Sequence, residues 1–243
     1  MIPLIRGWTS VDRTALANIR LGTVLSFVAG ATNAGGFLAV GQYTSHMTGI
    51  VSSVADHLVL GQLSLAAAGL AALLAFMAGT ITTVWLVNWG LHRHLRSAYG
   101  LPLLLESMLL LIFGLFGAAI NLSAALLVPL TVLILCFIMG LQNAVITKIS
   151  KAVIRTTHIT GLVTDLGMEI GRLLYINRSA SSTPVLADRA KLRIHLTLIL
   201  SFFIGGLAGA IGFKQLGYVT TLPLALLLLV LVLRPVLQDL RSR

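Results

Sequence analysis

Charged side chains are scarce in this sequence: they account for 10% of its 243 residues, whereas hydrophobic residues account for 57%. A soluble domain needs far more charge on its surface, so the composition excludes one and indicates a polytopic membrane protein. Cysteine is almost absent, because Cys136 is the only one and lies within an apolar run. The sequence therefore excludes an internal disulfide framework and a metal site built from paired cysteines.

Acidic residues are also few, with 7 Asp and Glu against 17 Lys and Arg, which gives a net charge of +10. A positive charge can indicate nucleic-acid binding, but here the basic residues lie in short segments between apolar runs. That is where the positive-inside rule places the Lys and Arg residues of a membrane protein. We therefore expect the lipid bilayer as the partner of this chain, and no nucleic acid.

Six apolar segments are long enough to cross a hydrocarbon core, which takes about 20 helical residues. They cover residues 19–40, 65–89, 101–120, 124–147, 194–213 and 218–233. No small-residue cleavage site clearly follows the first segment, so we expect an uncleaved span rather than a signal peptide. Two further segments, 46–63 and 158–176, are shorter and more polar. We expect these two to lie in the interface or to enter the membrane only part-way.

The basic residues orient the spans. With six spans and a cytoplasmic N-terminus, sixteen of the seventeen basic residues fall on the cytoplasmic side, and only Lys214 falls outside. If segments 46–63 and 158–176 also crossed the membrane, five more basic residues would move outside. The positive-inside rule therefore favours six spans with both the N- and C-termini in the cytoplasm.

Seven residues of the sequence occur twice in nearly the same form. The stretch SHMTGIV covers residues 45–51 and THITGLV covers 157–163, with His, Thr, Gly and Val identical. Asn33 lies thirteen residues before His46, and Asn143 lies fifteen residues before His158. Two landmarks in the same order indicate a duplication, with one copy at about 19–120 and the other at about 124–237. Each copy holds three spans, an odd number, so the second copy must be inverted in the membrane.

We therefore predict an all-α polytopic membrane protein that forms a single membrane domain over residues 1–243. Its fold is a 3+3 inverted repeat of about six transmembrane helices, with one short motif-bearing helix in each copy. Inverted-repeat transporters build their sites from interrupted helices that meet near the midplane. The glycine-rich stretch GATNAGG at 30–36 is an expected interruption of the first span, and residues 140–143 are its counterpart.

The repeated motif has the chemistry of a helix start. Its hydroxyl residues are good N-caps, because a hydroxyl accepts hydrogen bonds from first-turn amides. They are Ser45, Thr48, Thr157 and Thr160. Glycine leaves those amides open to a ligand, a helix N-terminus favours an anion or carboxylate, and histidine adds a donor or a proton. The candidate substrate-binding residues are Asn33, His46, Thr48, Gly49, Asn143, His158, Thr160, Gly161 and Asp165.

Close packing alone is the competing interpretation, because small and polar residues often serve helix contacts in membranes. We favour a ligand site, since polar groups at membrane depth are costly and usually functional. Asp165 follows Gly161 by about one helical turn on the same face. Glu106 is expected to reach the inner interface by snorkelling and to be structural. Gly205 and Gly209 are expected to form a close helix contact.

At these residues the chain resembles the YoaK-like family of bacterial membrane proteins, a domain of unknown function with about six spans. The resemblance covers nearly the whole chain. It rests on NAGGFLAVGQYTSHMTG at 33–49 and on GLQNAVITKISKAVIRTTHITGLVTDLGMEIGRLLY at 140–175. Family members often carry Asp in place of Asn33, and often a polar Asn where this chain has Ile50 and Leu162. The resemblance implies the fold and a bacterial inner membrane, but no activity.

We expect a small-solute permease or channel, with anions among the candidate solutes, and with its site at the two motif helix starts. The alternatives are a structural or assembly protein without a ligand and, less favoured, an intramembrane enzyme. No nucleophile with a base and an orienting group is visible, and no H-E-x-x-H spacing occurs, so we expect no catalytic residues, metal or cofactor. The sequence leaves open the solute and whether the chain forms a homo-oligomer.

Overall fold

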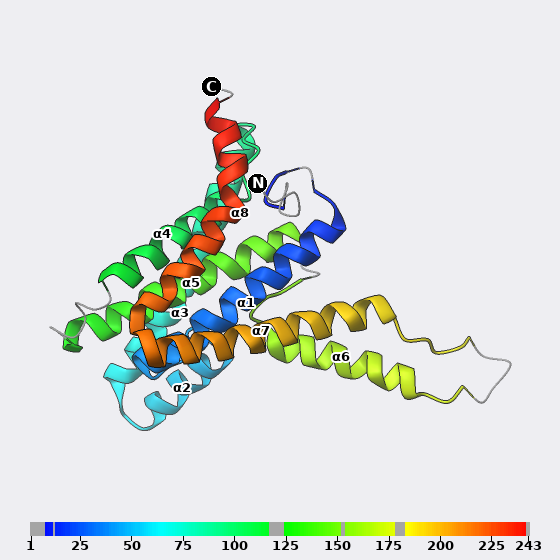
Figure 1. Ribbon diagram of the computed structural model, residues 1–243. Helices are drawn as coiled ribbons and strands as arrows, with labels where there is room; N and C mark the ends of the chain where they lie inside the picture. The colour runs from blue at the N-terminus through cyan, green and yellow to red at the C-terminus, as the bar shows by residue number, and fades with distance from the viewer. Residues whose placement is uncertain (1–7, 12, 117–123, 152–153, 178–182, 242–243) are drawn as a thin grey trace.

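A computed structural model of the chain describes residues 8–11, 13–116, 124–151, 154–177 and 183–241 (Figure 1). Within these ranges every regular element is a helix. The elements are α1 (Ala15–Val40), α2 (Met47–Val59), α3 (Leu63–His92), α4 (Leu101–Phe116), α5 (Ala124–Ile149), α6 (Ile159–Leu174), α7 (Arg189–Leu216), the 3-10 helix η3 (Gly217–Thr220) and α8 (Thr221–Arg241). The predicted end of the third span and of the first copy, at 117–120, lies outside the described residues.

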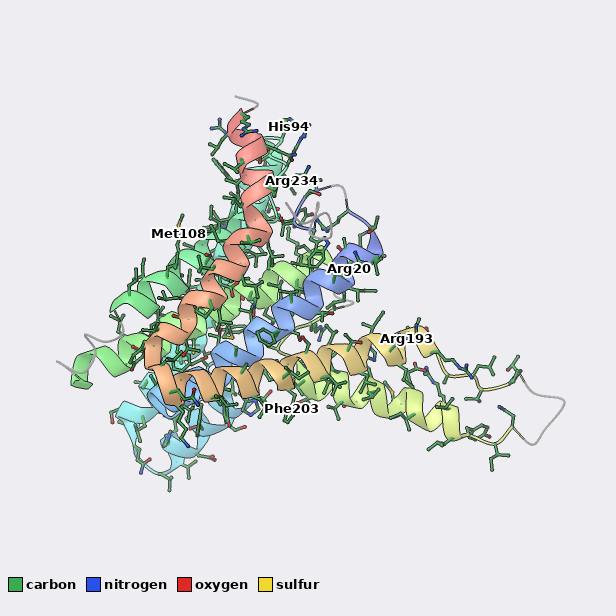
Figure 2. All side chains as sticks on the ribbon, viewed as in Figure 1. Arg20, His94, Met108, Arg193, Phe203 and Arg234 are labelled. Carbon is green, nitrogen blue, oxygen red and sulfur yellow. The ribbon has the colours of Figure 1, made fainter. Side chains whose placement is uncertain are left out.

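Four helical stretches of the described chain are long and apolar enough to cross a membrane. They are Ala15–Val40, Leu63–His92, Pro129–Ile149 and the continuous run Arg189–Arg241, which contains α7, η3 and α8. α4 is a shorter apolar helix. Large apolar side chains are exposed along these helices, and Met108 and Phe203 point away from the neighbouring helices in Figure 2. Such a surface is suited to lipid rather than to water.

Each of the eight segments predicted to be helical corresponds to a helix of the described chain, and most of their ends agree within a few residues. Residues 60–62 and 175–176, at the ends of the two motif segments, lie outside those helices. The largest differences are at α7, which begins five residues earlier than predicted, and at α8. α8 runs past the predicted end at 233, through Pro235, to Arg241. Apolar length predicts only the part of a helix that suits the hydrocarbon, so it misses polar extensions into the interface.

The predicted interruption of the first span is wrong. α1 is continuous from Ala15 to Val40, and its glycines Gly30, Gly35 and Gly36 are buried inside it. α5 is likewise continuous through residues 140–143. These glycines do not break the helices. They allow neighbouring helices to approach closely, because their missing side chains leave space for atoms of those helices.

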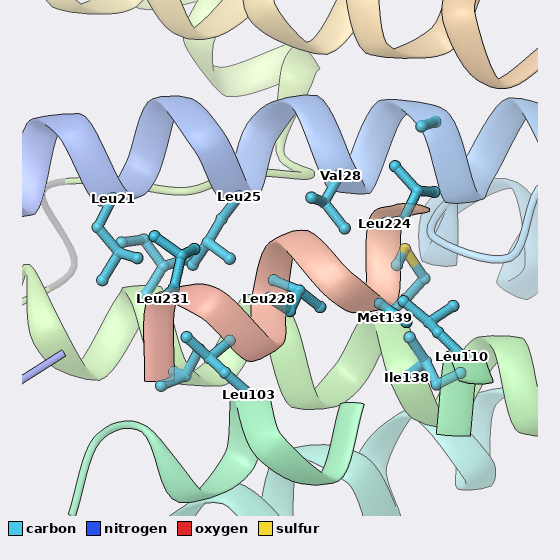
Figure 3. Close-up of a cluster of buried hydrophobic side chains, with 14 of the residues drawn as sticks. Leu21, Leu25, Val28, Leu103, Leu110, Ile138, Met139, Leu224, Leu228 and Leu231 are labelled. Atoms are coloured by element: carbon cyan, nitrogen blue, oxygen red, sulfur yellow. The ribbon is translucent and has the colours of Figure 1, made fainter. Parts of the chain in front are cut away.

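α1 and α5 cross in the core and run antiparallel. Gly22, near the start of α1, lies beside Ile146 near the end of α5, whereas Gly36 lies beside Leu135. α4 and α8 close this core from the other side (Figure 3). Its fully buried side chains include Leu21, Leu25, Val28, Leu103, Leu110, Ile138, Met139 and Leu228. α7 packs on α1, and α3 and α4 pack on α5, so this antiparallel pair lies at the centre of the arrangement.

One four-residue pattern, Phe-x-x-Gly, recurs in four helices and forms very close contacts between them. The copies that form these contacts are 27–30 in α1, 76–79 in α3, 137–140 in α5 and 202–205 in α7, and an overlapping copy at 203–206 does not form one. Where α1 lies along α7, a Cβ on Gly30 would overlap the carbonyl oxygen of Phe202. In return, a Cβ on Gly205 would overlap the carbonyl oxygen of Phe27. The contact is reciprocal, so neither helix has room for a side chain there.

The same reciprocal contact joins α3 to α5. A Cβ on Gly79 would overlap the carbonyl oxygen of Phe137, and a Cβ on Gly140 would overlap that of Phe76. In a membrane, helices associate through van der Waals packing and hydrogen bonds, both of which need closely approaching backbones. The four Phe-x-x-Gly glycines therefore hold the two tightest helix pairs together.

The predicted close contact at Gly205 and Gly209 is confirmed. Gly209 lies against the backbone of Ala31, so both glycines of α7 face α1. At the same interface, Ser201 Oγ donates a hydrogen bond of 2.7 Å to the carbonyl oxygen of Thr23. The α1–α7 pair thus combines small residues with an interhelical hydrogen bond.

Polar contacts tie one end of the helix bundle together. The Asp239 carboxylate accepts hydrogen bonds from the backbone N–H groups of Arg96 (2.9 Å) and Ser97 (2.8 Å), in the connection between α3 and α4. The Arg13 guanidinium lies over the Tyr99 ring, 4.1 Å from its centroid. Both described ends of the chain lie here, and Figure 2 shows the same end carrying Arg20, His94 and Arg234.

Candidate functional site

The turn after α1 carries the first motif back onto that helix. α1 ends at Gly41, whose φ of 72° is the left-handed conformation that commonly ends helices and that glycine adopts without strain. The chain then returns so that the buried Asn33 Oδ1 accepts hydrogen bonds from the Ser45 backbone N–H (3.1 Å) and Oγ (2.9 Å). Asn33 therefore positions the backbone immediately before His46.

Both motif histidines stand at the start of their helices. His46 is the N-cap residue of α2 and His158 is that of α6, and neither helix has a side-chain cap. Each imidazole lies over the glycine three residues on, where a Cβ on Gly49 or Gly161 would overlap the ring. The prediction that the motif hydroxyls cap these helices is wrong, because they stand one residue before and two residues after the cap position.

The second motif is anchored to the same helix as the first. Ser26 Oγ in α1 lies 3.4 Å from the carbonyl oxygen of Thr156 and 3.2 Å from that of Leu198. Ser26 and Asn33 are seven residues apart, so they share one face of α1 at a separation of about 10 Å along its axis. The backbone before each motif therefore rests on one face of α1.

A cavity of about 410 Å³ lies beside the first motif, between the end of α1, α2 and the start of α3. The rings of Phe37 and Tyr43 stack on one another with centroids 4.5 Å apart. The lining side chains include Phe37, Tyr43, His46, His57 and Leu65. In the part of the chain that the structure describes, no group of three or more His, Cys, Asp and Glu residues is placed to hold a metal ion. The cavity is lined by aromatic, aliphatic and polar side chains, with His46 of the first motif among them.

Four of the predicted binding residues belong to the first motif region. His46 and Gly49 line the cavity, and Asn33 supports it through Ser45. Thr48 is exposed in the first turn of α2 and is not among the residues that line the cavity. The structure thus brings together three of these four.

Four of the other five predicted residues belong to α6 or its N-cap, and α6 packs on α7, whereas Asn143 lies in α5. His158, Thr160 and Gly161 form the first turn of α6, and the Asn143 Oδ1 atom in α5 is buried without a hydrogen-bond partner among the described residues. Asp165 Oδ2 lies 4.0 Å from His195 Nε2 on α7. None of these five lines the cavity at the first motif.

Glu169 holds the far end of α6. Its carboxylate accepts a hydrogen bond of 2.7 Å from Arg172 Nη1 and one of 2.8 Å from the backbone N–H of Asp188. Because Asp188 is the N-cap of α7, this carboxylate joins the end of α6 to the start of α7. Glu169 is therefore a structural residue and not part of the candidate site.

Sequence reasoning missed several buried polar groups close to the predicted residues. Thr32 in α1, Gln142 in α5, and Thr44 and Thr156 before the two motifs are almost fully buried. Their side-chain polar atoms have no hydrogen-bond partner among the described residues. Buried polar groups are normally paired, so unpaired ones mark places where water, an ion or a solute can bind. Each stands one residue before a motif or an Asn landmark, so extending those patterns by one residue would have found them.

Long apolar helices, a lipid-suited surface and buried polar groups between the helices define a helical integral membrane protein. The chain belongs to the family described as Protein of unknown function (DUF1275), which matches residues 21–233. This match runs from α1 into α8 and includes both motifs. No curated protein matches the chain, and no solved structure does. The family match therefore establishes membership, and the activity has to be inferred from the site.

Proposed function

We propose that this protein is a small-solute permease or channel for an anionic or polar solute, with its binding site at the two motif helix starts. In this proposal α1, α3, α4, α5, α7 and α8 span the membrane as a 3+3 inverted repeat, and α2 and α6 are the short motif-bearing helices. The observation that carries it is the set of unpaired buried polar groups at matching positions in α1–α4 and α5–α8.

The pairing of the helices supports the inverted repeat. Exchanging α1–α4 with α5–α8 converts the α1–α7 pair into the α5–α3 pair, and the α2–α3 pair into the α6–α7 pair. The α1–α5 and α4–α8 pairs map onto themselves under the same exchange. The two reciprocal Phe-x-x-Gly contacts also exchange with one another. An antiparallel arrangement of α1 and α5 is what two oppositely oriented copies require.

The unpaired polar groups follow the same exchange. Thr32 corresponds to Gln142, since each stands one residue before its Asn landmark, and Thr44 corresponds to Thr156. Leaving such groups unpaired costs stability, and the cost is offset when a bound solute supplies the missing hydrogen bonds. A site that serves transport explains why the cost recurs at equivalent positions in both copies.

The chemistry of the motif favours an anion. The starts of α2 and α6 present first-turn amides without a side-chain cap, and a helix N-terminus carries partial positive charge. The rings of His46 and His158 add N–H donors. The cavity of about 410 Å³ beside His46 is large enough for a small organic anion.

We also infer that the protein is a YoaK-like member of its family and resides in a bacterial inner membrane with both termini in the cytoplasm. The motif-bearing stretches at 33–49 and 140–175 support the first inference. The basic side chains at the end that holds both described chain ends support the orientation. In this orientation the first motif is reached from outside and the second from the cytoplasm.

Solute binding to the purified protein is the direct test. We expect at least one compound from a panel of small inorganic anions, carboxylic acids and nucleobases to raise the melting temperature, because a ligand that binds only the native state stabilises it. At about 100 times Kd the gain is about 2.7 kcal/mol. We expect the paired variant His46→Ala/His158→Ala to lose this shift and to abolish flux in proteoliposomes. We expect the same of Thr44→Val/Thr156→Val, which removes the unpaired buried hydroxyls before the two motifs.

Two variants outside the site serve as matched controls. His92→Ala removes an exposed histidine at the end of α3, and Thr82→Val removes a hydroxyl that only donates to the Ala78 carbonyl oxygen. Both should keep the thermal shift and the flux. If no compound shifts wild type, a structural or assembly protein replaces the permease. If the paired variants keep shift and flux, the motifs are not the binding site.

A further inference from the structure

Glu106 is buried in the middle of the apolar core. It is 0% exposed, and neither carboxyl oxygen has a hydrogen-bond partner in the described chain. The prediction that it snorkels to the interface is wrong. Leu103 and Leu110, about one turn away on either side, belong to the core between α4, α5 and α8 (Figure 3), so this face of α4 points inward. The position is therefore too deep for the carboxyl to reach water.

The register of α4 against α5 places a second unpaired group at the level of Glu106. The two helices run antiparallel, and Leu110 lies beside Ile138 (Figure 3). Glu106 is four residues before Leu110, and Gln142 is four residues after Ile138, so the two side chains lie at about the same level of the core. Gln142 is also 0% exposed, and both of its side-chain polar atoms lack a partner among the described residues.

No charged side chain of α8 or α5 reaches this level within the described residues. Ser107 Oγ donates to the Ala225 carbonyl oxygen at 2.7 Å, and the charged residues of α8 begin at Arg234, more than two turns beyond Ala225. On α5, Cys136 packs in a separate cluster, and Lys148 Nζ donates to an amide oxygen on α3. Neither helix therefore offers Glu106 a compensating charge.

The remaining neighbours of α4 are α3 and η3. His92, the one ionisable residue of α3, is exposed at the end of that helix. Tyr218 in η3 packs edge-on against Phe113, two turns along α4 from Glu106. Within the described residues, the helices that pack on α4 thus bring no charged or ionisable side chain to the level of Glu106.

We propose that Glu106 is a proton-binding site of the transport cycle, neutral in this closed arrangement and ionised when α4 moves away from α5 and α8; this rests on the proposed function. An ionised carboxylate without a partner is very costly in an apolar interior. A neutral carboxylic acid has an O–H that can donate to the Gln142 side-chain oxygen after rotation of either side chain. The Gln142 amide, at the same level of the core, therefore suits the protonated form of Glu106.

Proton exchange follows from opening and closing of this interface. When water enters between the helices, the O–H bond of the acid breaks, the proton passes to water, and a hydrated carboxylate remains. The reverse step restores the acid before the helices close again. Because only the neutral form is stable in the closed core, closure requires a bound proton, which couples a proton to the conformational change.

Isotope labelling can test this assignment without any solute. Glu106 and Glu169 are the only glutamates in the chain, so glutamate labelled with carbon-13 at its carboxyl reports on two sites. Infrared spectra of the protein in lipid nanodiscs separate an acid C=O band from carboxylate bands. At about pH 7 we expect one labelled acid band, although an ordinary glutamate is ionised there. Glu106→Gln should remove the band, and the matched control Glu169→Gln should retain it.

Two further readouts test the exchange of the proton. Raising the pH to about 10, where an ordinary carboxyl is fully ionised, should abolish the band, and transfer to heavy water should shift it. Gln142→Leu should move the band to higher frequency, because the acid loses its acceptor while Glu106 itself is unchanged. This variant also provides a test if Glu106→Gln fails to fold.

Several results would overturn the proposal. Absence of an acid band at neutral pH, or its persistence in Glu106→Gln, would show that Glu106 does not hold the proton. A band that neither titrates nor exchanges deuterium would show a locked, purely structural proton. These infrared readouts do not depend on the solute. A thermal-shift screen without a hit would count against the permease, whereas the infrared spectra alone would decide whether Glu106 is protonated.

Discussion

Gly79→Ala is expected to lower the free energy of unfolding by about 3 kcal/mol, near the upper end for overpacked sites. The added methyl group would overlap the carbonyl oxygen of Phe137, and a backbone atom cannot move aside as a side chain does. α3 and α5 must therefore separate, which also stretches the hydrogen bond of 3.0 Å from Thr83 Oγ1 to the Leu141 carbonyl oxygen. Unfolding by SDS in mixed micelles measures the change.

Gly167→Ala is the matched control, because nothing lies within 4 Å of the space that its Cβ would occupy in α6. We expect this change to be neutral or to stabilise by up to about 1 kcal/mol, since alanine favours helices over glycine. The double variant Gly79→Ala/Gly140→Ala should cost less than the sum of the single changes, because the first already separates the helices. Equal stability of Gly79→Ala and Gly167→Ala would contradict the close contact.

Asp239→Ala is expected to lower the free energy of unfolding by about 3 kcal/mol, because hydrogen bonds to a charged group are strong and buried N–H groups are costly to leave unpaired. The change removes the acceptor of the Arg96 and Ser97 backbone N–H groups, which joins α8 to the start of α4. Asp188→Ala, which removes an exposed N-cap, should cost only about 1 kcal/mol. Equal costs would show that the Asp239 carboxylate does not hold this end together.

The effect of Asp239→Ala should shrink at acid pH. Burial raises the pKa of Asp239, but hydrogen bonds from Ser97 and Arg96 and the charge of Arg96 outweigh burial and hold the pKa below its ordinary value. A carboxyl of this kind contributes stability above its unfolded pKa of about 3.9, and loses it as the pH falls through the folded pKa. Stability measured from about pH 7 down to about pH 3 should therefore show wild type approaching the variant. A difference that stays constant over this range would be inconsistent with the lowered pKa.

The helices and the motif positions could be predicted because they depend on local properties. Apolar length, helix-starting residues and basic connections are read along the chain without knowledge of its neighbours. SHMTGIV and THITGLV each begin a short helix, as their composition indicates. The close contact at Gly205 and Gly209 was also predictable, because two small residues four apart form one helix face.

Other features could not be predicted because they depend on which helix faces a residue. GATNAGG has the composition of a helix break, yet it is a smooth helix whose glycines meet α7 and a leucine of α5. Glu106 stands near enough to a helix end to snorkel, yet α8 and α5 cover it. The Phe-x-x-Gly pattern is present in the sequence, but only the reciprocal contacts show what the four contacting copies have in common.

Composition, apolar length and repetition are properties of the chain alone, and they were enough to predict a helical membrane protein, the positions of its helices and its repeated residues. The pairing of polar groups, in contrast, depends on how the helices pack. The bonds of Ser26 with Thr156 and of Asp239 with Arg96 join residues 130 and 143 positions apart. Glu106 and Gln142 are both buried without a partner among the described residues, because of the helices that pack around α4 and α5. Whether a buried group finds a partner depends on the helices that fold against it, and no local pattern encodes that.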